Sequence, residues 1–97
     1  MPKIQIATLR ALPGQEEKLS ALLLAIRDYA RSDKEPGCVS YDVARAGADF
    51  ACIEVYGNGA AIQEHGEKNE GVAELMKAFA AGDVVDGSPV LTAYEQL

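Results

Sequence analysis

The order in which the spacing of apolar residues changes along this chain constrains its fold more than any other feature. Residues 3–11 alternate, with Ile4 and Ile6 on one face and Ala7 and Leu9 on the other, which is the period of a β-strand. Apolar residues then recur at helical spacing over about residues 15–32. The chain therefore begins with a strand that is followed by a helix.

The remainder of the chain repeats these two patterns in a different order. Strand-forming segments at residues 38–45 and 50–56 flank a short polar loop that is typical of a hairpin. A second region of helical spacing covers about residues 60–81, and a final strand is predicted at residues 89–94. The hairpin register that pairs residue 45 with residue 50 would keep the two cysteines apart, so we expect two free thiols.

The resulting β-α-β-β-α-β order predicts one α+β domain over residues 1–97. This order is that of the ferredoxin-like fold, in which both helical regions cover one face of a four-stranded antiparallel sheet. We expect the second helical region to be interrupted near Gly66 and Gly71.

The sheet face opposite the helices carries more apolar side chains than a face in water should. Ile4 and Ile6 would lie on it, and the two strands of the hairpin are apolar on both faces. Two-fold pairing is the commonest way to cover such a surface. We therefore expect a homodimer that forms through this face.

Composition and charge exclude several classes of function. The net charge is −6, with 15 acidic against 9 scattered basic residues, so we expect no binding to nucleic acid or anionic membranes. No apolar run could span a bilayer, and the first residues enter a strand rather than a signal peptide, which favours the cytoplasm. No nucleotide-binding loop, metal-ligand spacing or serine elbow occurs, so we expect neither a cofactor nor a metal ion.

His65 is the first candidate for chemistry, because it is the single histidine and lies on the apolar stripe of the second helical region. An imidazole in the gap between helix and sheet could act as a general base or bind an enolic or phenolic oxygen. The alternative is a core histidine that only hydrogen-bonds to the backbone.

The other polar residues are weaker candidates for a functional role. Tyr41, Tyr56 and Tyr94 could offer phenol groups to a ligand, although tyrosines on strands more often pack. Glu54 lies within an apolar strand and needs a partner, for which we favour Arg10 in a purely structural pair. No histidine stands near Cys38 in the sequence, which argues against a nucleophilic thiol.

Four blocks of the chain closely resemble the antibiotic biosynthesis monooxygenase (ABM) family in order and spacing. They are Ala7-Thr8-Leu9-Arg10-Ala11-x-Pro13-Gly14, Glu35-Pro36-Gly37-Cys38-x-x-Tyr41-Asp42, Glu54-Val55-Tyr56 followed by Ala60-Ala61-Ile62-x-x-His65, and Thr92-x-Tyr94-Glu95-x-Leu97. This resemblance implies a dimeric α/β barrel with a ligand pocket between helices and sheet. It also implies that His65 matches the recurring histidine of the family. The pocket-lining residues that we expect are Ala7, Leu9, Tyr41, Tyr56, Ile62, Met76 and Phe79.

The activities that the resemblance implies differ in how well the residues match. Heme-degrading members carry an Asn, a Trp and a His at positions where this chain has Ala7, His65 and Leu75, which argues against heme degradation. Quinol-type members often carry a second histidine where Glu70 stands here. We expect first a cofactor-independent monooxygenase acting on a quinol or polycyclic phenol, with His65 as the catalytic base. The alternatives are an isomerase or lyase of a small oxygenated metabolite with His65 as proton shuttle, and a non-catalytic small-molecule-binding dimer.

Overall fold

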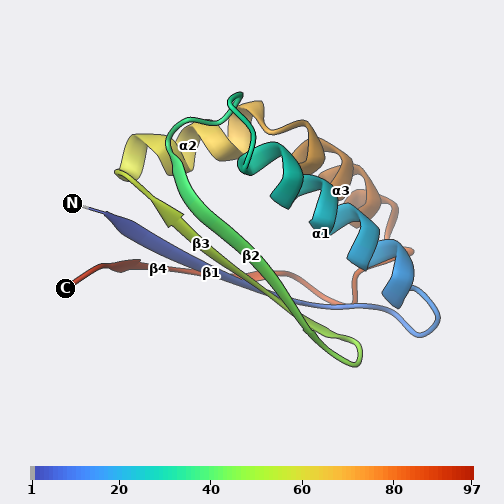
Figure 1. Cartoon of the computed structure of the whole chain (residues 1–97). Helices are drawn as coiled ribbons and strands as arrows, with labels where there is room; N and C mark the ends of the chain where they lie inside the picture. Colours follow the sequence, from blue (N-terminus) through green and yellow to red (C-terminus); the bar gives the residue numbers. More distant parts are fainter. Residues whose placement is uncertain (1) are drawn as a thin grey trace.

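The computed structural model describes residues 2–97 and confirms the α+β ferredoxin-like fold. Three helices cover one face of a four-stranded sheet (Figure 1). The elements are β1 (Lys3–Arg10), α1 (Glu16–Ala30), β2 (Cys38–Ala46), β3 (Asp49–Tyr56), α2 (Gly59–Lys68), α3 (Glu70–Ala81) and β4 (Val90–Glu95).

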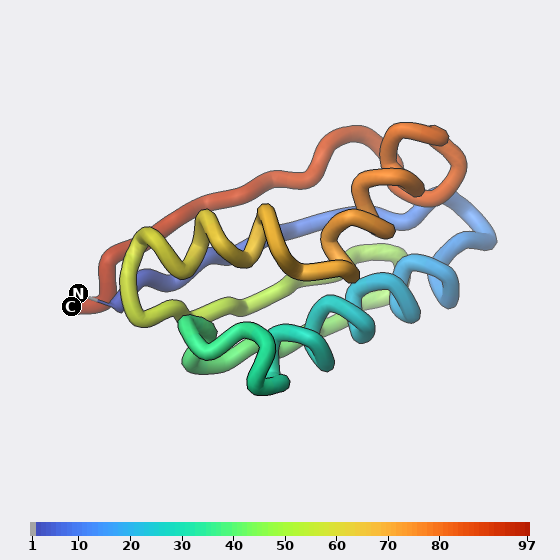
Figure 2. The backbone as a smooth tube through the Cα atoms, turned by 90° about the horizontal axis from the view of Figure 1, so that it is seen from above, coloured from blue at the N-terminus to red at the C-terminus, as the bar shows by residue number. Residues whose placement is uncertain are grey.

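The sheet has the strand order β2-β3-β1-β4, and every neighbouring pair is antiparallel. Arg45 pairs with Phe50 and Tyr41 with Glu54, as the predicted register requires. Both cysteines are free, which confirms the prediction of two thiols. From above, α1 lies on the side of the β2–β3 hairpin, and α2 and α3 lie between α1 and β4 (Figure 2).

The second helical region is two helices rather than one, and they meet at Asn69 instead of at a glycine. Asn69 has an extended backbone with φ −71° and ψ 115°, so it ends α2. Its side-chain oxygen accepts hydrogen bonds from the backbone N–H groups of Gly71 and Val72 and thereby caps α3. The prediction of an interruption is confirmed, but its position is set by this cap. Gly66 lies inside α2.

Gly71 lets α1 and α3 approach very closely. A Cβ atom at this position would lie 2.8 Å from both the Cγ1 and the backbone nitrogen of Ile26. Ile26 is itself buried, in the stripe of α1 that faces the core. The interhelix distance therefore depends on the missing side chain of residue 71.

The two faces of the sheet differ sharply in burial. On β3, Phe50, Cys52, Glu54 and Tyr56 are buried beneath the helices, in strict alternation with half-buried residues. The opposite side, here called the outer sheet face, presents cross-strand neighbours such as Ile6–Ile53, Ile4–Val55 and Ile4–Tyr94. Within residues 2–97, no helix is long and apolar enough to cross a membrane.

Candidate functional site

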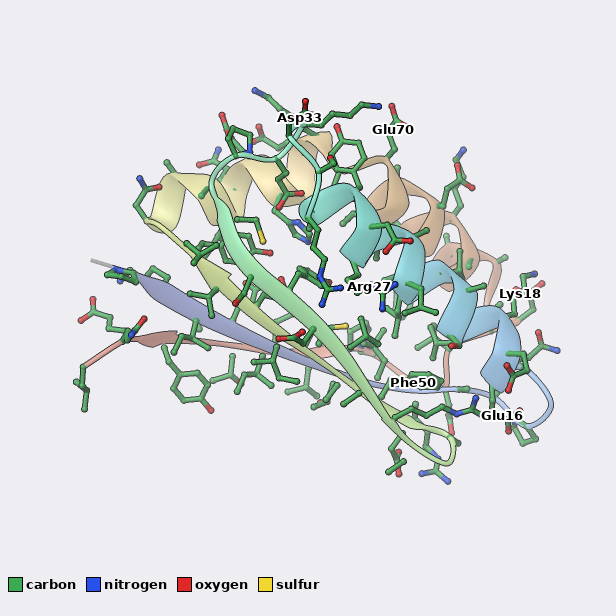
Figure 3. The ribbon with its side chains drawn as sticks, in the orientation of Figure 1. Glu16, Lys18, Arg27, Asp33, Phe50 and Glu70 are labelled. Atoms are coloured by element: carbon green, nitrogen blue, oxygen red, sulfur yellow. The ribbon has the colours of Figure 1, made fainter. Side chains whose placement is uncertain are left out.

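A cavity of about 300 Å³ lies between the helices and the covered face of the sheet. Its wall is mainly apolar, with Met76 on α3 and Leu91 on β4 exposed at 56% and 62%, so its mouth lies between these two elements. Charged side chains such as Asp33 and Glu70 lie on the other side of the helical layer (Figure 3). The lining residues are Gln5, Ala7, Leu9, Leu23, Ile26, Tyr41, Cys52, Glu54, Ile62, His65, Gly66, Val72, Leu75, Met76, Pro89 and Leu91.

His65 reaches this cavity from the buried side of α2. The helix starts at the Asn58 cap, whose side chain accepts a hydrogen bond from the Ala61 N–H, and its two buried residues are Ala61 and His65. These residues are four apart and so share one helix face. The His65 ring lies 5.4 Å from the Tyr41 ring and 5.5 Å from the Tyr56 ring, measured between centroids.

The carboxylate of Glu35 holds one side of the His65 ring. His65 Nδ1 lies 2.9 Å from Glu35 Oε2 and 3.0 Å from Oε1, and both side chains are buried. An ionised carboxylate can only accept hydrogen bonds, so Nδ1 carries the proton in this contact. A neutral His65 therefore has its lone pair on Nε2, on the other side of the ring.

Glu35 is positioned by the loop between α1 and β2 and by the junction of α2 and α3. The Asn69 side-chain amide donates to Glu35 Oε1 at 2.9 Å and to the Ile26 carbonyl at 3.2 Å. A Cβ on Gly37 would lie 2.6 Å from the Cβ of Ala61, so only glycine lets this loop pack against α2. The Asn69 cap and the glycine of the loop thus fix the pair of Glu35 and His65.

Glu54 occupies the other side of the imidazole. Its Oε1 accepts hydrogen bonds from the Tyr56 hydroxyl at 2.5 Å and from Gln5 Nε2 at 3.3 Å, and lies 3.8 Å from His65 Nε2. The predicted pairing of Glu54 with Arg10 is wrong. Arg10 lies on the outer sheet face, where it binds Asp49 at 2.8 Å, whereas Glu54 lies opposite Gln5 on the covered face.

Two acceptor atoms remain open to the cavity. Neither His65 Nε2 nor Glu54 Oε2 has a hydrogen-bond partner among the described residues. Over the same residues, no side-chain nitrogen or oxygen is sealed from solvent without a partner. Since both side chains line the cavity, these two atoms must reach its surface. The site can therefore accept a proton or a hydrogen bond from a bound molecule.

Burial raises the pKa of Glu54 from its usual value, and the nearby Glu35 adds to this rise. The hydrogen bond from Tyr56, the neighbouring His65 and the hydrogen bond from Gln5 act in the opposite direction but do not cancel it. Burial also raises the pKa of the Tyr41 and Tyr56 hydroxyls, with the Glu54 charge as the next cause. Both phenols thus stay protonated at neutral pH.

The raised pKa makes the stability of the protein depend on pH through Glu54. The folded state binds the proton of the Glu54 carboxyl group more tightly than the unfolded chain does. The contribution of this group to the free energy of unfolding is therefore complete below about pH 4.3 and is lost as the pH rises. We expect the free energy of unfolding of Glu54→Gln, relative to wild type, to increase from about pH 4 to pH 8. Urea unfolding at several pH values measures it. Glu67→Gln, which changes an exposed residue of α2, should show a flat difference, and a flat result for both would contradict the assignment.

The structure brings most of the expected pocket residues together. Five of them line the cavity, namely Ala7, Leu9, Tyr41, Ile62 and Met76. Tyr56 is fully buried behind Glu54 and contributes its hydrogen bond rather than a surface. Phe79 is not in the cavity wall and packs against the hydrophobic core.

Other sequence-based interpretations change once the register is known. Tyr94 pairs with Ile4 and lies on the outer sheet face, away from the cavity, at 50% exposure. Burial raises the pKa of the Cys38 thiol to about 11, in keeping with an unreactive thiol. Within the described residues, no group of three or more His, Cys, Asp or Glu side chains could hold a metal ion.

The sequence reasoning missed Glu35 and Asn69 and assigned Glu54 to structure. Glu35 stands in a Pro-Gly turn, where an acidic residue is ordinarily solvated, and Asn69 stands in a polar stretch. Nothing local in the sequence indicates that these residues meet His65. The one available signal was the position of Glu54, an acid in the middle of an apolar strand.

Comparison with known proteins places the fold and the family. The antibiotic biosynthesis monooxygenase (ABM) family matches residues 2–81. No curated protein matches the sequence. Rv0793 from Mycobacterium tuberculosis is 26% identical with a TM-score of 0.84, over 100% of this chain and 96% of its own. PA3566 from Pseudomonas aeruginosa is 26% identical with a TM-score of 0.85, over 99% of this chain and 94% of its own.

A third solved structure carries the family name. It is called antibiotic biosynthesis monooxygenase and is 21% identical with a TM-score of 0.81, over 100% of this chain and 99% of its own. At this identity the likeness shows the fold alone. The family match itself runs from β1 to the end of α3 and includes every side chain described above as touching His65. The chain therefore belongs to the antibiotic biosynthesis monooxygenase family.

Proposed function

We propose that this protein is a cofactor-independent monooxygenase that acts on a small quinol or polycyclic phenol. One observation carries the proposal: His65, held at Nδ1 by the buried Glu35, presents Nε2 to a largely apolar cavity. A general base needs a free lone pair within reach of the substrate proton and a group that stabilises the charge it acquires. His65 and Glu35 meet both requirements.

In this mechanism the substrate binds with a hydroxyl group toward His65 Nε2. Transfer of the phenolic proton to Nε2 produces an imidazolium that lies between Glu35 and Glu54, so its charge is balanced on both sides. The phenolate left in the cavity is far richer in electrons than the phenol and can react with dioxygen. The apolar wall limits water around the oxygenated intermediate.

The substrate supplies all the electrons that dioxygen takes up, which removes the need for a flavin or a metal. One oxygen atom forms a new bond to a ring carbon, and the O–O bond then breaks so that the second atom leaves as water. The quinol leaves as a hydroxyquinone. The two protons of this water come from the quinol, and His65 is the group that accepts and returns a proton during the cycle.

A second candidate is an isomerase or lyase of a small oxygenated metabolite. The observation that favours it is the pair of titratable groups, with Glu54 Oε1 3.8 Å from His65 Nε2. Two such groups side by side can take a proton from one atom of a substrate and return it to another. This chemistry consumes no oxygen.

Oxygen consumption with menadiol separates these candidates. We expect the protein to accelerate oxygen uptake and to form a hydroxyquinone that contains one atom of isotopically labelled dioxygen, detected by mass spectrometry. Uncatalysed oxidation gives the quinone and hydrogen peroxide instead. If labelled hydroxyquinone never exceeds the protein-free control, with menadiol or with a panel of other hydroquinones, the monooxygenase proposal fails. Turnover of a metabolite without oxygen would favour the isomerase.

We also propose that the functional form is a homodimer that buries the outer sheet face. This face presents Ile4, Ile6, Ile53 and Val55, while Val90 of β4 is 61% exposed. Sedimentation velocity should give twice the 10.3 kDa chain mass. Ile53→Lys should weaken association by at least about 100-fold, because it would bury an unpaired ammonium group. A wild-type chain that sediments as a monomer at micromolar concentration would refute the dimer.

A further inference from the structure

We infer that this cavity excludes anionic ligands and takes an uncharged aromatic compound with a hydroxyl or amide N–H donor, and that Glu54 determines this preference. The inference deepens the proposed function and rests on it, since it assigns the ligand class of the same cavity. It concerns binding, however, and can be tested without turnover.

The cavity wall contains no lysine or arginine. Its polar side chains are those of Gln5, Tyr41, Cys52, Glu54 and His65, and all other lining residues are apolar or glycine. Binding of a phosphate or carboxylate inside a protein ordinarily relies on a guanidinium, an ammonium or a row of backbone N–H groups. Here the imidazole is the one group in the wall that can become cationic.

The imidazole is not available to bind an anionic ligand, because it already interacts with two carboxylates. Glu35 lies 2.9 Å from Nδ1, and Glu54 lies 3.8 Å from Nε2. All three side chains are buried, so their charges are screened little by solvent. The cluster therefore contains two acids and one base, and the imidazole has no unpaired charge to offer an anion.

The basic residues near the cavity are engaged at the surface. Arg31 donates to the Tyr41 carbonyl and forms an ion pair with Asp42 at 2.9 Å. Arg27 pairs with Asp28 at 2.9 Å, and Lys68 lies 3.4 Å from Glu64 on the exposed side of α2. None of these residues lines the cavity, so an anion that enters it leaves its water without gaining a cation.

The open groups of the wall are suited to a ligand that donates hydrogen bonds. Nε2 of the neutral His65 ring and Oε2 of the ionised Glu54 carboxyl group are both acceptors that reach the cavity surface. An incoming anion would meet Glu54 Oε2, because Tyr56 and Gln5 both bind the other oxygen, Oε1. The cavity volume of about 300 Å³ is the volume that about ten water molecules occupy in the liquid, and a ligand with one or two aromatic rings would fit in it.

Two isosteric naphthalene compounds test this inference directly. 2-Naphthamide and 2-naphthoate have the same shape and differ in charge, and 2-naphthol adds the hydroxyl donor. We expect calorimetry at neutral pH to show 2-naphthamide and 2-naphthol binding at least about tenfold more tightly than 2-naphthoate, because the anion meets like charge in a medium of low dielectric. Glu54→Gln should reduce several-fold the ratio between the affinity for 2-naphthamide and the affinity for 2-naphthoate. Glu67→Gln, which removes the same charge from the exposed side of α2, should leave it unchanged.

The outcomes separate the ligand class from the reaction. Binding of 2-naphthoate as tight as that of 2-naphthamide, or binding of none of the three compounds, overturns the inference. The wild-type ratio alone decides this if Glu54→Gln does not fold. An unchanged ratio in folded Glu54→Gln removes Glu54 as its cause. A clear preference for the neutral compounds together with no oxygen uptake would keep the inference and refute the monooxygenase.

Discussion

Replacing His65 with alanine is expected to lower the catalysed rate of menadiol oxygenation by about 10²–10⁴-fold. His65 Nε2 is the open base of the cavity, and its charge after proton transfer is balanced by Glu35 and Glu54. Without this ring the wall has no basic nitrogen that can take the phenolic proton, so the reactive phenolate forms more slowly. The initial rate of hydroxyquinone formation, corrected for the protein-free rate, measures the effect.

Two further variants locate the source of such a loss. Glu35→Gln keeps an acceptor for His65 Nδ1 but removes the charge, so we expect a smaller loss together with a change in the pH profile. Gln63→Ala, on the exposed side of α2, should leave the rate unchanged. Equal rates for wild type and a folded His65→Ala would remove His65 from the mechanism and with it the basis of the proposed function.

Gly71→Ala is expected to destabilise the protein by about 2–3 kcal/mol, through the overpacking of a rigid contact. The new Cβ would lie 2.8–2.9 Å from three atoms of Ile26, two of which belong to its backbone. Helix α1 would have to move as a whole, because backbone atoms cannot turn away as a side chain can. The same movement would disturb the hydrogen bond from Asn69 to the Ile26 carbonyl and hence the position of Glu35.

Gly66→Ala provides the matched control. Its Cβ would have nothing within 4 Å, and residue 66 lies inside α2. We expect a gain of about 0.5–1 kcal/mol from helix propensity. Urea unfolding of both variants measures the difference. Equal stability of the two variants would show that α1 and α3 do not approach as closely as described.

The elements of the fold were largely predictable, because each depends on a local pattern. Alternation on β1 and β3 and the apolar stripe of α1 each arise from a period that neighbouring residues set. The register of the hairpin followed from its short loop, and it correctly placed Tyr41 opposite Glu54. The break between α2 and α3 was expected near glycines. It falls at Asn69, because a side-chain cap stabilises a helix start more than a glycine does.

The site was predictable only in part. Strand alternation predicted that Ala7, Leu9 and Tyr41 lie on the covered face of the sheet, and helical spacing predicted that Ile62 and Met76 face it. All five line the cavity. Phe79 has the same spacing but lies outside the cavity wall, where it is partly buried and packs against the hydrophobic core. Arg10 is not the partner of Glu54, because successive residues of a strand face opposite sides of the sheet. Gln5 lies on the same face as Glu54, whereas Arg10 lies on the other face.

By itself, the sequence determined the order of strands and helices, the surplus of apolar residues on the outer sheet face, and the single histidine on the buried side of α2. Only the tertiary structure brought Glu35 and Glu54 to the two sides of that histidine, from positions 30 and 11 residues away along the chain. The physical reason is that the two kinds of information act over different distances along the chain. Periodicity records which way a side chain faces within its own element, whereas a buried charge is balanced by whatever group the packing of other elements brings near it.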